Sequence, residues 1–481
     1  MANSASERLR KGEVYKFEMR GHKIALDVRR SLFFRLDEVA DEILRLPDGL
    51  SSDEIVAKLE GRYNRQPILD ALGELKEVGI IFSGEMEEQL FSPPDHTEIT
   101  SLSLHVSHDC NLRCRYCYGD NGVYGGERMY MNGEVAFKAV DFLLQESGEQ
   151  KKCNLIFFGG EPMLNLKLMK EVVEYGKRKG EETGKEIGFS VTTNGTILGD
   201  DVIDYLNREK MTALISIDGP KEIQDLQRPF ASGAGSYNRI VPQLKAFLRS
   251  RERKVGARVT ITPHSLCFLD TVTHLVDLGF LGVSIAMASG PPGEWTITEE
   301  HLPAIEEEYE RATDYFLERI SQKQYFRFGN LTDPMRLTYF AQQRHYGCGV
   351  GRTYVAVTPT GEIFPCHRFA GMKDLSMGNL FNGFNQSWQR RFLKNHVENR
   401  ESCRTCWARY LCGGGCAYYS ISEGKDIAQP SYLFCRVRKR LLELAMFIHS
   451  EISLKDRSII EELYSTVRRP YMEEESTVKK K

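Results

Sequence analysis

Short apolar runs alternate with amphipathic stretches through the middle of the chain. Amphipathic stretches such as 134–145, 167–178 and 237–251 predict helices between the runs. Polar and Gly-rich motifs follow successive runs, and a β/α barrel carries its chemistry at the carboxyl ends of its strands. The pattern therefore predicts an α/β fold over residues 98–290 and favours a partial (β/α)6 barrel over an open doubly wound sheet. The six apolar runs, typical of buried parallel strands, are 102–107, 154–159, 188–194, 212–218, 256–262 and 281–287.

The pattern over residues 14–88 predicts a separate small unit of strands followed by helices. VYKFEMRGHKIALDV, with a turn at Gly21, and SLFFRL predict short strands. Their order gives a winged-helix-like shape, which serves as a packing domain, a peptide-binding module or a DNA-binding unit. The region lacks a strong Lys/Arg face, which argues against DNA. The helical patterns cover 37–46, 52–63 and 66–78.

The remaining domain boundaries are predicted from Pro-rich segments and from the positions of the cysteines. Pro93-Pro94-Asp95 marks a linker before the barrel. A helical bridge is expected over 291–345, and a cysteine-rich domain that depends on metal for its order over 346–450. Residues 451–481 are expected to form a C-terminal helix and a charged tail.

Composition narrows the class of protein. The 481 residues carry 64 basic and 67 acidic side chains, so the formal charge of −3 gives no reason to expect a nucleic-acid partner. No apolar stretch approaches the roughly 18 residues that span a bilayer, and the N-terminus lacks the apolar core of a secretory signal. A cytoplasmic protein without a membrane partner is expected. Its 12 cysteines are then more suited to metal or redox chemistry than to disulfides.

The first cysteine motif follows the first predicted barrel strand directly. Cys110, Cys114 and Cys117 form a C-x3-C-x2-C triplet on one loop. Three thiolates hold three irons of a [4Fe–4S] cube and leave the fourth iron open to a cofactor or substrate. The alternative is a zinc knuckle, but zinc normally takes four ligands, and no well-placed His completes the set.

This triplet, with Tyr116 before its last cysteine, resembles the signature of the radical S-adenosylmethionine (SAM) enzymes. After the second strand, Gly159-Gly160-Glu161-Pro162 matches the GGEP motif of that superfamily. The glycines are expected to let the backbone approach a ligand, and Glu161 to accept hydrogen bonds from the methionine ammonium of SAM. By the same resemblance, Ser216 and Arg228 would hold the SAM carboxylate, Asn194 its ribose or methionine part, and Tyr116 would lie near the adenine.

The second cysteine array resembles the SPASM extension, which carries two auxiliary iron–sulfur clusters in radical SAM enzymes that modify peptides and proteins. A zinc-ribbon pair is the alternative, since C-x2-C and C-x3-C are also zinc spacings. The resemblance implies that the ligands cross over between the clusters. The distal cluster would take Cys403, Cys406, Cys412 and Cys435. The nearer cluster would take Cys348, Cys366 and Cys416.

The nearer set has only three cysteines. Some relatives supply an extra Cys a few residues after the first position, whereas here the stretch from Gly349 to Tyr354 has none. An open auxiliary iron could bind a substrate thiolate, because a coordinating metal deprotonates a thiol. Three [4Fe–4S] clusters and SAM are thus the expected cofactors.

Residues 15–450 resemble the ranthipeptide thioether maturases, the six-Cys-in-forty-five and freyrasin types. The likeness rests on LSLHVSHDCNLRCRYCYGDNGVYGGER, FFGGEPMLN, AVTPTGEIFPCHRFAG and CRTCWARYLCGGGCAYY, among other stretches. It implies a 5′-deoxyadenosyl radical that abstracts hydrogen from a precursor peptide, and a peptide Cys that supplies sulfur from the open auxiliary iron. It also implies that the N-terminal unit binds the leader of that Cys-containing precursor by strand addition. An electron donor such as flavodoxin or ferredoxin is expected.

Departures from the six-Cys pattern keep other activities open. Ile285-Ala286-Met287-Ala288 stands where many six-Cys maturases carry Glu-Pro, and Tyr118 stands where Phe is frequent. The alternatives are maturation of quinohemoprotein amine dehydrogenase, carbon–carbon cross-linking and sulfatase-type formylglycine formation. A zinc-binding winged-helix regulator is the alternative outside enzymes.

Overall fold

A computed structural model describes residues 8–83, 91–251, 255–455 and 458–466. Its centre is a sheet in which the six predicted barrel strands lie side by side and parallel, in chain order. The partial (β/α)6 barrel expected from the apolar runs is confirmed. The strands are β6 (Ser101–His108), β8 (Lys152–Gly159), β9 (Glu186–Thr193), β10 (Thr212–Ser216), β11 (Gly256–Ile261) and β12 (Gly282–Met287).

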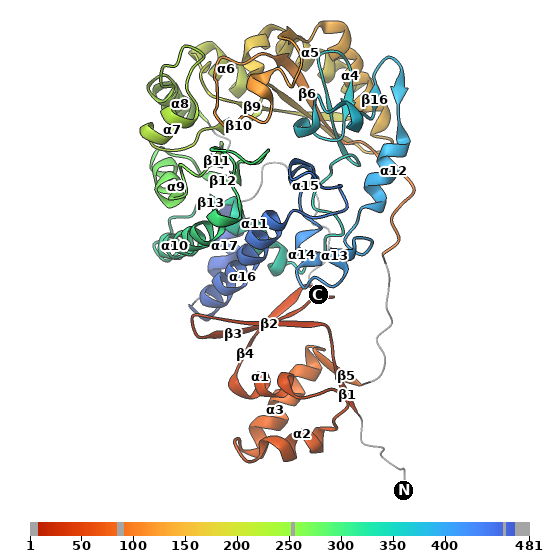
Figure 1. The fold of residues 1–481 in the computed structure, drawn as a ribbon, viewed down its shortest axis with the longest axis vertical. Coiled ribbons are helices and arrows are strands. Elements are labelled where there is room, and N and C mark those ends of the chain that lie inside the picture. The colour runs from red at the N-terminus through yellow and green to blue at the C-terminus, as the bar shows by residue number, and fades with distance from the viewer. Residues whose placement is uncertain (1–7, 84–90, 252–254, 456–457, 467–481) are drawn as a thin grey trace.

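The sheet is wider than the sequence pattern indicated. On one side β13 (Arg327–Phe328) pairs parallel with β12, and on the other β14 (Tyr354–Val357) pairs parallel with β6. The antiparallel strand β15 (Ile363–Phe364) follows β14, and β7 (Met129–Tyr130) pairs with the end of β6. Through β14, the cysteine-rich region, whose later part is drawn in blue in Figure 1, is hydrogen-bonded directly to the first barrel strand.

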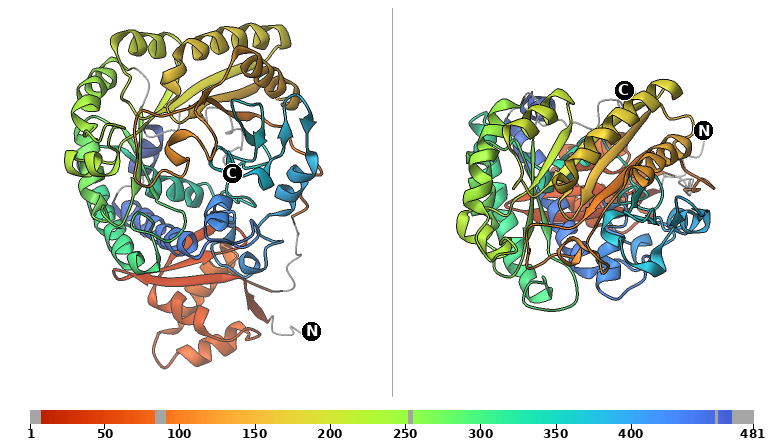
Figure 2. Two further views of the ribbon diagram at one scale, coloured as in Figure 1. Left: turned by 45° about the horizontal axis from the view of Figure 1, so that its top comes forward. Right: turned by 90° about the horizontal axis from the view of Figure 1, so that it is seen from above.

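Helices follow the barrel strands and lie along the outside of the sheet (Figure 2). The stretches predicted as helical at 134–145, 167–178 and 237–251 are all helices, although α5 continues five residues beyond the prediction. Pro242 lies within α8 without ending it. The helices are α4 (Gly133–Glu146), α5 (Leu166–Thr183), α6 (Asp200–Arg208), α7 (Lys221–Gln227), α8 (Tyr237–Ser250) and α9 (Phe268–Asp277).

Burial along three of the barrel strands, β8, β11 and β12, alternates with a period of two. In β11 and β12 every second residue is buried, and the residues between them are partly exposed. The buried set, which includes Val259 and Ile285, belongs to the main hydrophobic core. Because successive side chains of a strand point to opposite faces, the other set, which includes Arg258 and Ser284, faces the interior of the partial barrel.

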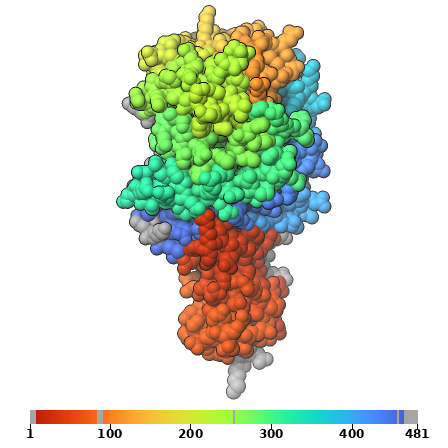
Figure 3. Space-filling model, turned by 60° about the vertical axis from the view of Figure 1, so that its left-hand side comes forward, coloured from red at the N-terminus to blue at the C-terminus, as the bar shows by residue number. Residues whose placement is uncertain are grey.

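The small N-terminal domain has a hydrophobic core of its own, with Ile55, Leu59 and Leu72 near its centre. It protrudes from the main body at one end (Figure 3). Its predicted elements are confirmed, including the turn at Gly21, where φ is +79°, and the capping box of Ser51 and Glu54. They are β2 (Val14–Met19), β3 (His22–Asp27), β4 (Leu32–Leu36), α1 (Glu38–Arg45), α2 (Ser52–Leu59) and α3 (Arg65–Glu77). A further strand pair, β1 (Leu9–Lys11) with β5 (Ile81–Ser83), was not predicted.

The N-terminal sheet is anchored to the cysteine-rich region. The ring of Tyr15 stacks on Trp407 with centroids 4.0 Å apart and planes 2° apart. The hydroxyl of Tyr15 donates to Glu443 at 2.6 Å, and Arg409 pairs with Glu13. Since Trp407 follows Cys406 directly, this domain packs against a segment that carries cysteines.

Long helices connect the three parts. The bridge contains α10 (Leu302–Ser321) and α11 (Gly329–Tyr339), and both pack against α16 (Tyr432–Lys455). α16 also contacts β3 and runs through residue 450, where the sequence suggested a domain boundary. Most of the charged tail predicted within 451–481 lies outside the described residues.

The cysteine-rich region between β14 and α16 consists of short elements joined by turns. Its longest helix is α12 (Gln386–Lys394). The others are α13 (Glu401–Arg404), α14 (Arg409–Cys412) and α15 (Ala417–Ser422), with the two-residue strands β16 (Gly378–Asn379) and β17 (Gly383–Phe384). Across the described part of the chain, no helix combines the length and apolarity needed to cross a bilayer.

Candidate functional site

The first cysteine triplet lies on an irregular loop directly after β6. The backbone N–H of Arg113 donates to Pro229 at 2.8 Å, and that of Arg115 donates to Gln227 at 2.9 Å. These bonds attach the loop to the segment that follows α7 and contains Arg228. The structure thus brings Arg228 next to the triplet, although they are more than a hundred residues apart in sequence.

The three thiols share one environment. Burial is the main cause that raises the pKa of Cys110 to about 11 and that of Cys114 to about 12, and the charge of Cys117 acts in the same direction on both. The positive charge of neighbouring Arg228 lowers the pKa of both thiols. Two neighbouring thiols that resist ionisation without added positive charge fit, together with the third cysteine of the triplet, a bound iron–sulfur cluster, because metal coordination removes thiol protons.

The two glycines of the GGEP motif lie close to the backbone at the end of β6. A Cβ at Gly159 would lie 2.1 Å from the carbonyl oxygen of Ser107, and one at Gly160 would lie 2.2 Å from that of Asp109. The φ of Gly159 is +129°, a conformation that L side chains rarely adopt. Close approach of two protein segments, rather than of a ligand as the sequence suggested, is what requires glycine here.

Glu161 is fully buried and satisfied largely within the protein. Its carboxylate accepts from the Thr193 hydroxyl at 2.7 Å, the Asn194 N–H at 2.7 Å and the Met163 N–H at 3.0 Å. Burial raises its pKa, although these donors oppose the shift. Glu161 therefore joins the ends of β8 and β9, and only a small part of its accepting capacity remains for an ammonium group.

Asn194 is also engaged by protein partners. Its amide N–H groups donate to Asn111 at 2.9 Å and approach the Cys110 sulfur at 3.7 Å. Its carbonyl oxygen accepts from the N–H and the hydroxyl of Thr196. Asn194 thus orients the triplet loop. If it also contacts SAM as predicted, its amide group would have to bind SAM and these protein partners together.

Tyr116, Asp218 and Arg228 form a buried chain beside the triplet. Arg228 donates to the Tyr116 hydroxyl at 2.6 Å, and that hydroxyl donates to Asp218 at 2.6 Å. Gln227 and the N–H of Thr260 complete the donors to Asp218. Burial raises the pKa of Asp218, and Arg228 opposes that shift.

Two residues predicted to contact SAM have side-chain groups that are available for a further hydrogen bond. Arg228 Nε is buried without a hydrogen-bond partner, and the Ser216 hydroxyl is partly exposed at the end of β10 with none in the described part of the chain. A buried guanidinium N–H without a partner is costly unless a ligand supplies an acceptor. Arg228 and Ser216 therefore fit the carboxylate of an α-amino acid such as the methionine part of SAM.

The second array separates into two groups of thiols. Desolvation raises the pKa of Cys366, and the charges of Cys348 and Cys416 raise it further. In the same way, burial together with Cys412, Cys403 and Cys406 raises the pKa of Cys435 to about 12. These neighbours are compatible with ligands that cross over between two clusters, and the assignment of the seven cysteines to a distal and a nearer cluster stays a prediction.

None of the twelve cysteines is left to complete the nearer group. Cys153 is buried in β8, and Cys267 is exposed at the start of α9. Beside the nearer group, the Tyr354 hydroxyl and His367 Nδ1 are 2.6 Å apart, and the same nitrogen is 3.6 Å from the Cys366 sulfur. Burial lowers the pKa of His367 to about 3, so the ring is neutral.

The spacing within the groups differs from that of a single-ion site. In the described part of the chain, no three His, Cys, Asp or Glu side chains are arranged to share one metal ion. A zinc ion holds all its sulfur ligands at about 2.3 Å, whereas in a [4Fe–4S] cube each thiolate binds a separate iron.

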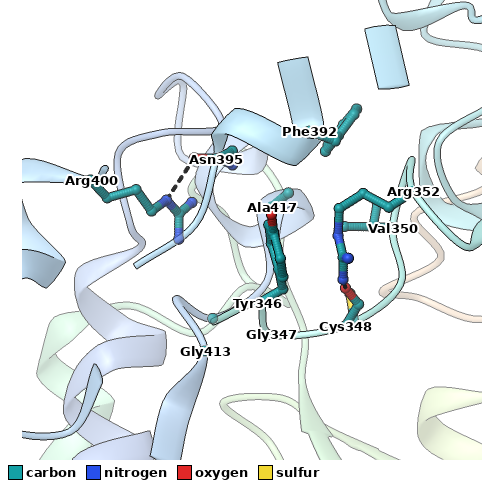
Figure 4. Close-up of a pocket in the computed structure, with 11 residues that line it drawn as sticks. Tyr346, Gly347, Cys348, Val350, Arg352, Phe392, Asn395, Arg400, Gly413 and Ala417 are labelled. Carbon is teal, nitrogen blue, oxygen red and sulfur yellow. Dashed lines mark hydrogen bonds between the residues drawn. The ribbon is translucent and has the colours of Figure 1, made fainter. Parts of the chain in front are cut away.

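A cleft with an empty volume of about 300 Å³ adjoins the nearer group. In Figure 4, Tyr346, Arg352 and Cys348 line one part of it, and Phe392 and Asn395 lie across from them. The guanidinium of Arg352 lies 3.6 Å from the ring centre of Tyr346 and donates to the Cys348 carbonyl. The cleft thus borders on the loop of Cys348.

Comparison with known families identifies both cysteine-bearing regions. The Radical SAM superfamily matches residues 104–264, and SPASM, an iron–sulfur cluster-binding domain, matches residues 348–407. The chain belongs to the radical SAM superfamily. It is a radical SAM enzyme with a SPASM domain, and these two domains imply [4Fe–4S] clusters and SAM as cofactors.

Among similar sequences, an uncharacterized protein of Methanocaldococcus jannaschii, MJ0907, is 30% identical over 212 residues, covering 43% of this chain and 68% of its own. The cysteine-type anaerobic sulfatase-maturating enzyme of Clostridium perfringens is 24% identical over 377 residues, covering 72% of this chain and 96% of its own.

Two solved structures share the fold. Native anSMEcpe with bound AdoMet and the Kp18Cys peptide has a TM-score of 0.63 at 19% identity, covering 74% of this chain and 99% of that one. Streptococcus suis SuiB bound to the precursor peptide SuiA has a TM-score of 0.51 at 16% identity, covering 89% and 99%.

Several residues of this radical SAM site were not singled out from the sequence. Asp218 holds Tyr116, and Arg368 and His367 follow Cys366 directly. The place of Asp218 just after the fourth barrel strand was a signal for it. The pairing of β14 with β6, which brings Tyr354 beside the nearer cysteine group, had no such signal.

Proposed function

We propose that the chain matures a ribosomally made precursor peptide by installing thioether cross-links from Cys sulfur to carbon. The observation that carries the proposal is the nearer auxiliary group, which has three cysteines and no fourth. With three [4Fe–4S] clusters bound, one auxiliary iron would keep a position for a peptide thiolate. The names of the similar proteins, a sulfatase-maturating enzyme and an enzyme crystallised with its precursor peptide, support a peptide or protein substrate.

The reaction balances as a two-electron oxidation of the peptide. SAM at a first cluster, which Cys110, Cys114 and Cys117 would hold, would supply a 5′-deoxyadenosyl radical with one electron from a donor such as flavodoxin or ferredoxin. The peptide would lose one hydrogen atom from the acceptor carbon and one proton from its thiol. It would gain the C–S bond and give up one electron, for which clusters held by the two auxiliary cysteine groups would be the acceptors.

The protein contributes binding and orientation. We assign Arg228 and Ser216 to the SAM carboxylate, because both keep free hydrogen-bonding capacity beside the triplet. Glu161, Asn194 and Tyr116 hold the ends of β8 and β9 and the triplet loop in place. Among the residues that the structure describes, β2 and β4 each pair only with β3, so the N-terminal sheet offers edges to which a leader peptide can add as a strand.

Arg228→Gln should weaken SAM binding about tenfold or more, because a carboxylate held by a guanidinium fork is worth more than one neutral hydrogen bond. Equilibrium binding of SAM to the reconstituted enzyme measures the effect. Arg115→Gln, which changes an exposed arginine of the triplet loop, is the control and should leave affinity unchanged. Equal affinities of wild type and Arg228→Gln would remove Arg228 from the SAM site.

A second candidate function is sulfatase-type formylglycine formation, favoured by the relative from Clostridium perfringens. A fully cysteine-ligated nearer cluster would suit it better than the three cysteines found here. Electron paramagnetic resonance of the auxiliary clusters separates the two. A Cys-containing precursor should perturb the signal of the nearer cluster, and the same peptide with Cys replaced by Ser should not. Identical spectra with both peptides would argue against thiolate capture.

A further inference from the structure

The loop after Cys348 is attached to the segment of a second cysteine of the nearer group. The backbone N–H of Gly351 donates to the carbonyl oxygen of Pro365 at 2.9 Å, and Pro365 directly precedes Cys366. Arg352 directly follows Gly351. The backbone of Arg352 is therefore fixed close to both of these cysteines.

The third cysteine of the nearer group, Cys416, is joined to the other side of the same loop. A Cβ at Gly347 would lie only 2.1 Å from the carbonyl oxygen of Gly415, so the two glycines are in close backbone contact. Gly347 directly precedes Cys348, and Gly415 directly precedes Cys416. Backbone contacts thus connect the Cys348 loop to the segments of both other cysteines predicted to hold the nearer cluster.

The side chain of Arg352 is held against this loop. Its Nη2 donates to the carbonyl oxygen of Cys348 at 2.7 Å, and its guanidinium lies 3.6 Å from the ring centre of Tyr346 (Figure 4). The Tyr346 hydroxyl donates to the Leu393 carbonyl at 2.7 Å, which fixes the ring. The carbonyl of Arg352 accepts from the Gln389 side chain at 3.0 Å. The positive charge of Arg352 is thereby fixed beside Cys348.

No carboxylate neutralises this charge in the part of the chain that the structure describes. There, the bond to the Cys348 carbonyl is the only hydrogen bond that the guanidinium donates, and Arg352 forms no ion pair. Arg344 donates to the carbonyl of Gly347 at 2.9 Å and likewise forms no ion pair within the described ranges. A partly buried cation costs less free energy when an anion lies beside it. The surroundings of Cys348 therefore suit an anionic group.

An iron–sulfur cluster is such a group, because its sulfides and thiolate ligands carry negative charge. Reduction adds one further negative charge to it. A fixed cation stabilises the more negative, reduced form more strongly, because the Coulomb attraction grows with charge. Net charge and hydrogen bonding around a cluster are among the factors that set its reduction potential.

We propose that Arg352 raises the reduction potential of the cluster held by Cys348, Cys366 and Cys416. Arg352 is a positioning residue: it acts through the cluster and does not contact the peptide. Its role in the reaction rests on the proposed function and deepens it. The peptide gives up one electron when the C–S bond forms, after the thiol proton has left, and a cluster at a raised potential would be the more favourable acceptor.

The test is a redox titration of reconstituted holoenzyme without peptide, followed by electron paramagnetic resonance. The signal of the nearer cluster is the one that changes in Cys348→Ser, because serine replaces one ligand of that cluster. In Arg352→Gln, the ratio of reduced to oxidised nearer cluster at a fixed potential should fall about tenfold, which equals about 59 mV for one electron. Arg352→Lys keeps the charge and should change the ratio less than about threefold.

Arg390→Gln is the matched control, because it removes the same charge from an exposed position on α12 of the same domain. Water and salt screen that charge, so the ratio should stay at the wild-type value. An unchanged ratio in Arg352→Gln would overturn the proposal. Equal shifts in the Gln and Lys variants would do so too, since charge would not be the cause. Loss of the nearer cluster from Arg352→Gln would show that Arg352 holds the loop instead, which also overturns it.

The outcome is separable from the proposed function, because no peptide is present in the titration. An unshifted potential in an enzyme that forms thioethers would reject the inference and retain the function. A shifted potential in an enzyme that forms no thioether would reject the function and retain the effect of Arg352 on the cluster.

Discussion

Cys114→Ala should abolish reductive SAM cleavage, with a loss of about a thousandfold or more, because two cysteines do not retain a cube that needs three. Cys110→Ala and Cys117→Ala should have the same effect. The auxiliary clusters should remain, since their cysteines lie in a different domain. The measurement is 5′-deoxyadenosine formed per enzyme under reducing conditions, together with iron and sulfide content.

Cys267→Ala is the matched control for these variants. Cys267 is exposed at the start of α9 and lies in neither auxiliary group. Its replacement should leave both cluster content and SAM cleavage at the wild-type level. Wild-type production of 5′-deoxyadenosine by Cys114→Ala would show that the triplet does not hold the SAM cluster.

Tyr354→Cys should close the open auxiliary position and abolish most thioether formation, about tenfold or more, while SAM cleavage persists. Position 354 lies beside the nearer group: the Cβ of Tyr354 is 3.2 Å from where a Cβ at Gly349, next to Cys348, would lie. A thiol there would compete with the peptide thiolate for the iron. Cross-linked peptide and 5′-deoxyadenosine are measured in the same reaction.

Tyr354→Phe separates this effect from the loss of the tyrosine itself. It removes the hydroxyl that contacts His367 but introduces no thiol. It should therefore retain most cross-linking activity and leave the spectrum of the nearer cluster open to perturbation by the precursor. If Phe and Cys at position 354 reduce cross-linking equally, the open iron is not where the peptide thiolate binds.

The barrel could be predicted because its six central strands are β-branched or largely apolar runs separated by amphipathic stretches. Such runs are typical of buried parallel strands. The strands β13 and β15 have two residues each and carry no pattern of their own, and β14 belongs to a region that the cysteines dominate. Their pairing is set by tertiary contacts, which the local sequence does not encode.

The cysteines expected to hold clusters could likewise be selected from their spacing, but the contacts of the residues around them could not. Gly159 and Gly160 fit a ligand-binding motif, yet the backbone of β6 is what approaches them. Glu161 has the right chemistry for an ammonium group, yet three protein donors occupy it.

The most direct test of thioether formation is tandem mass spectrometry of a short Cys-containing peptide encoded beside this gene, after reaction with the enzyme, SAM and a reductant. The account predicts that the peptide loses two hydrogen atoms for each cross-link and that the participating Cys no longer reacts with iodoacetamide. Fragmentation should then locate the new bond between that sulfur and a carbon of another residue. A peptide that loses two hydrogens while its thiols still alkylate, or that gains an aldehyde at Cys, would contradict thioether formation.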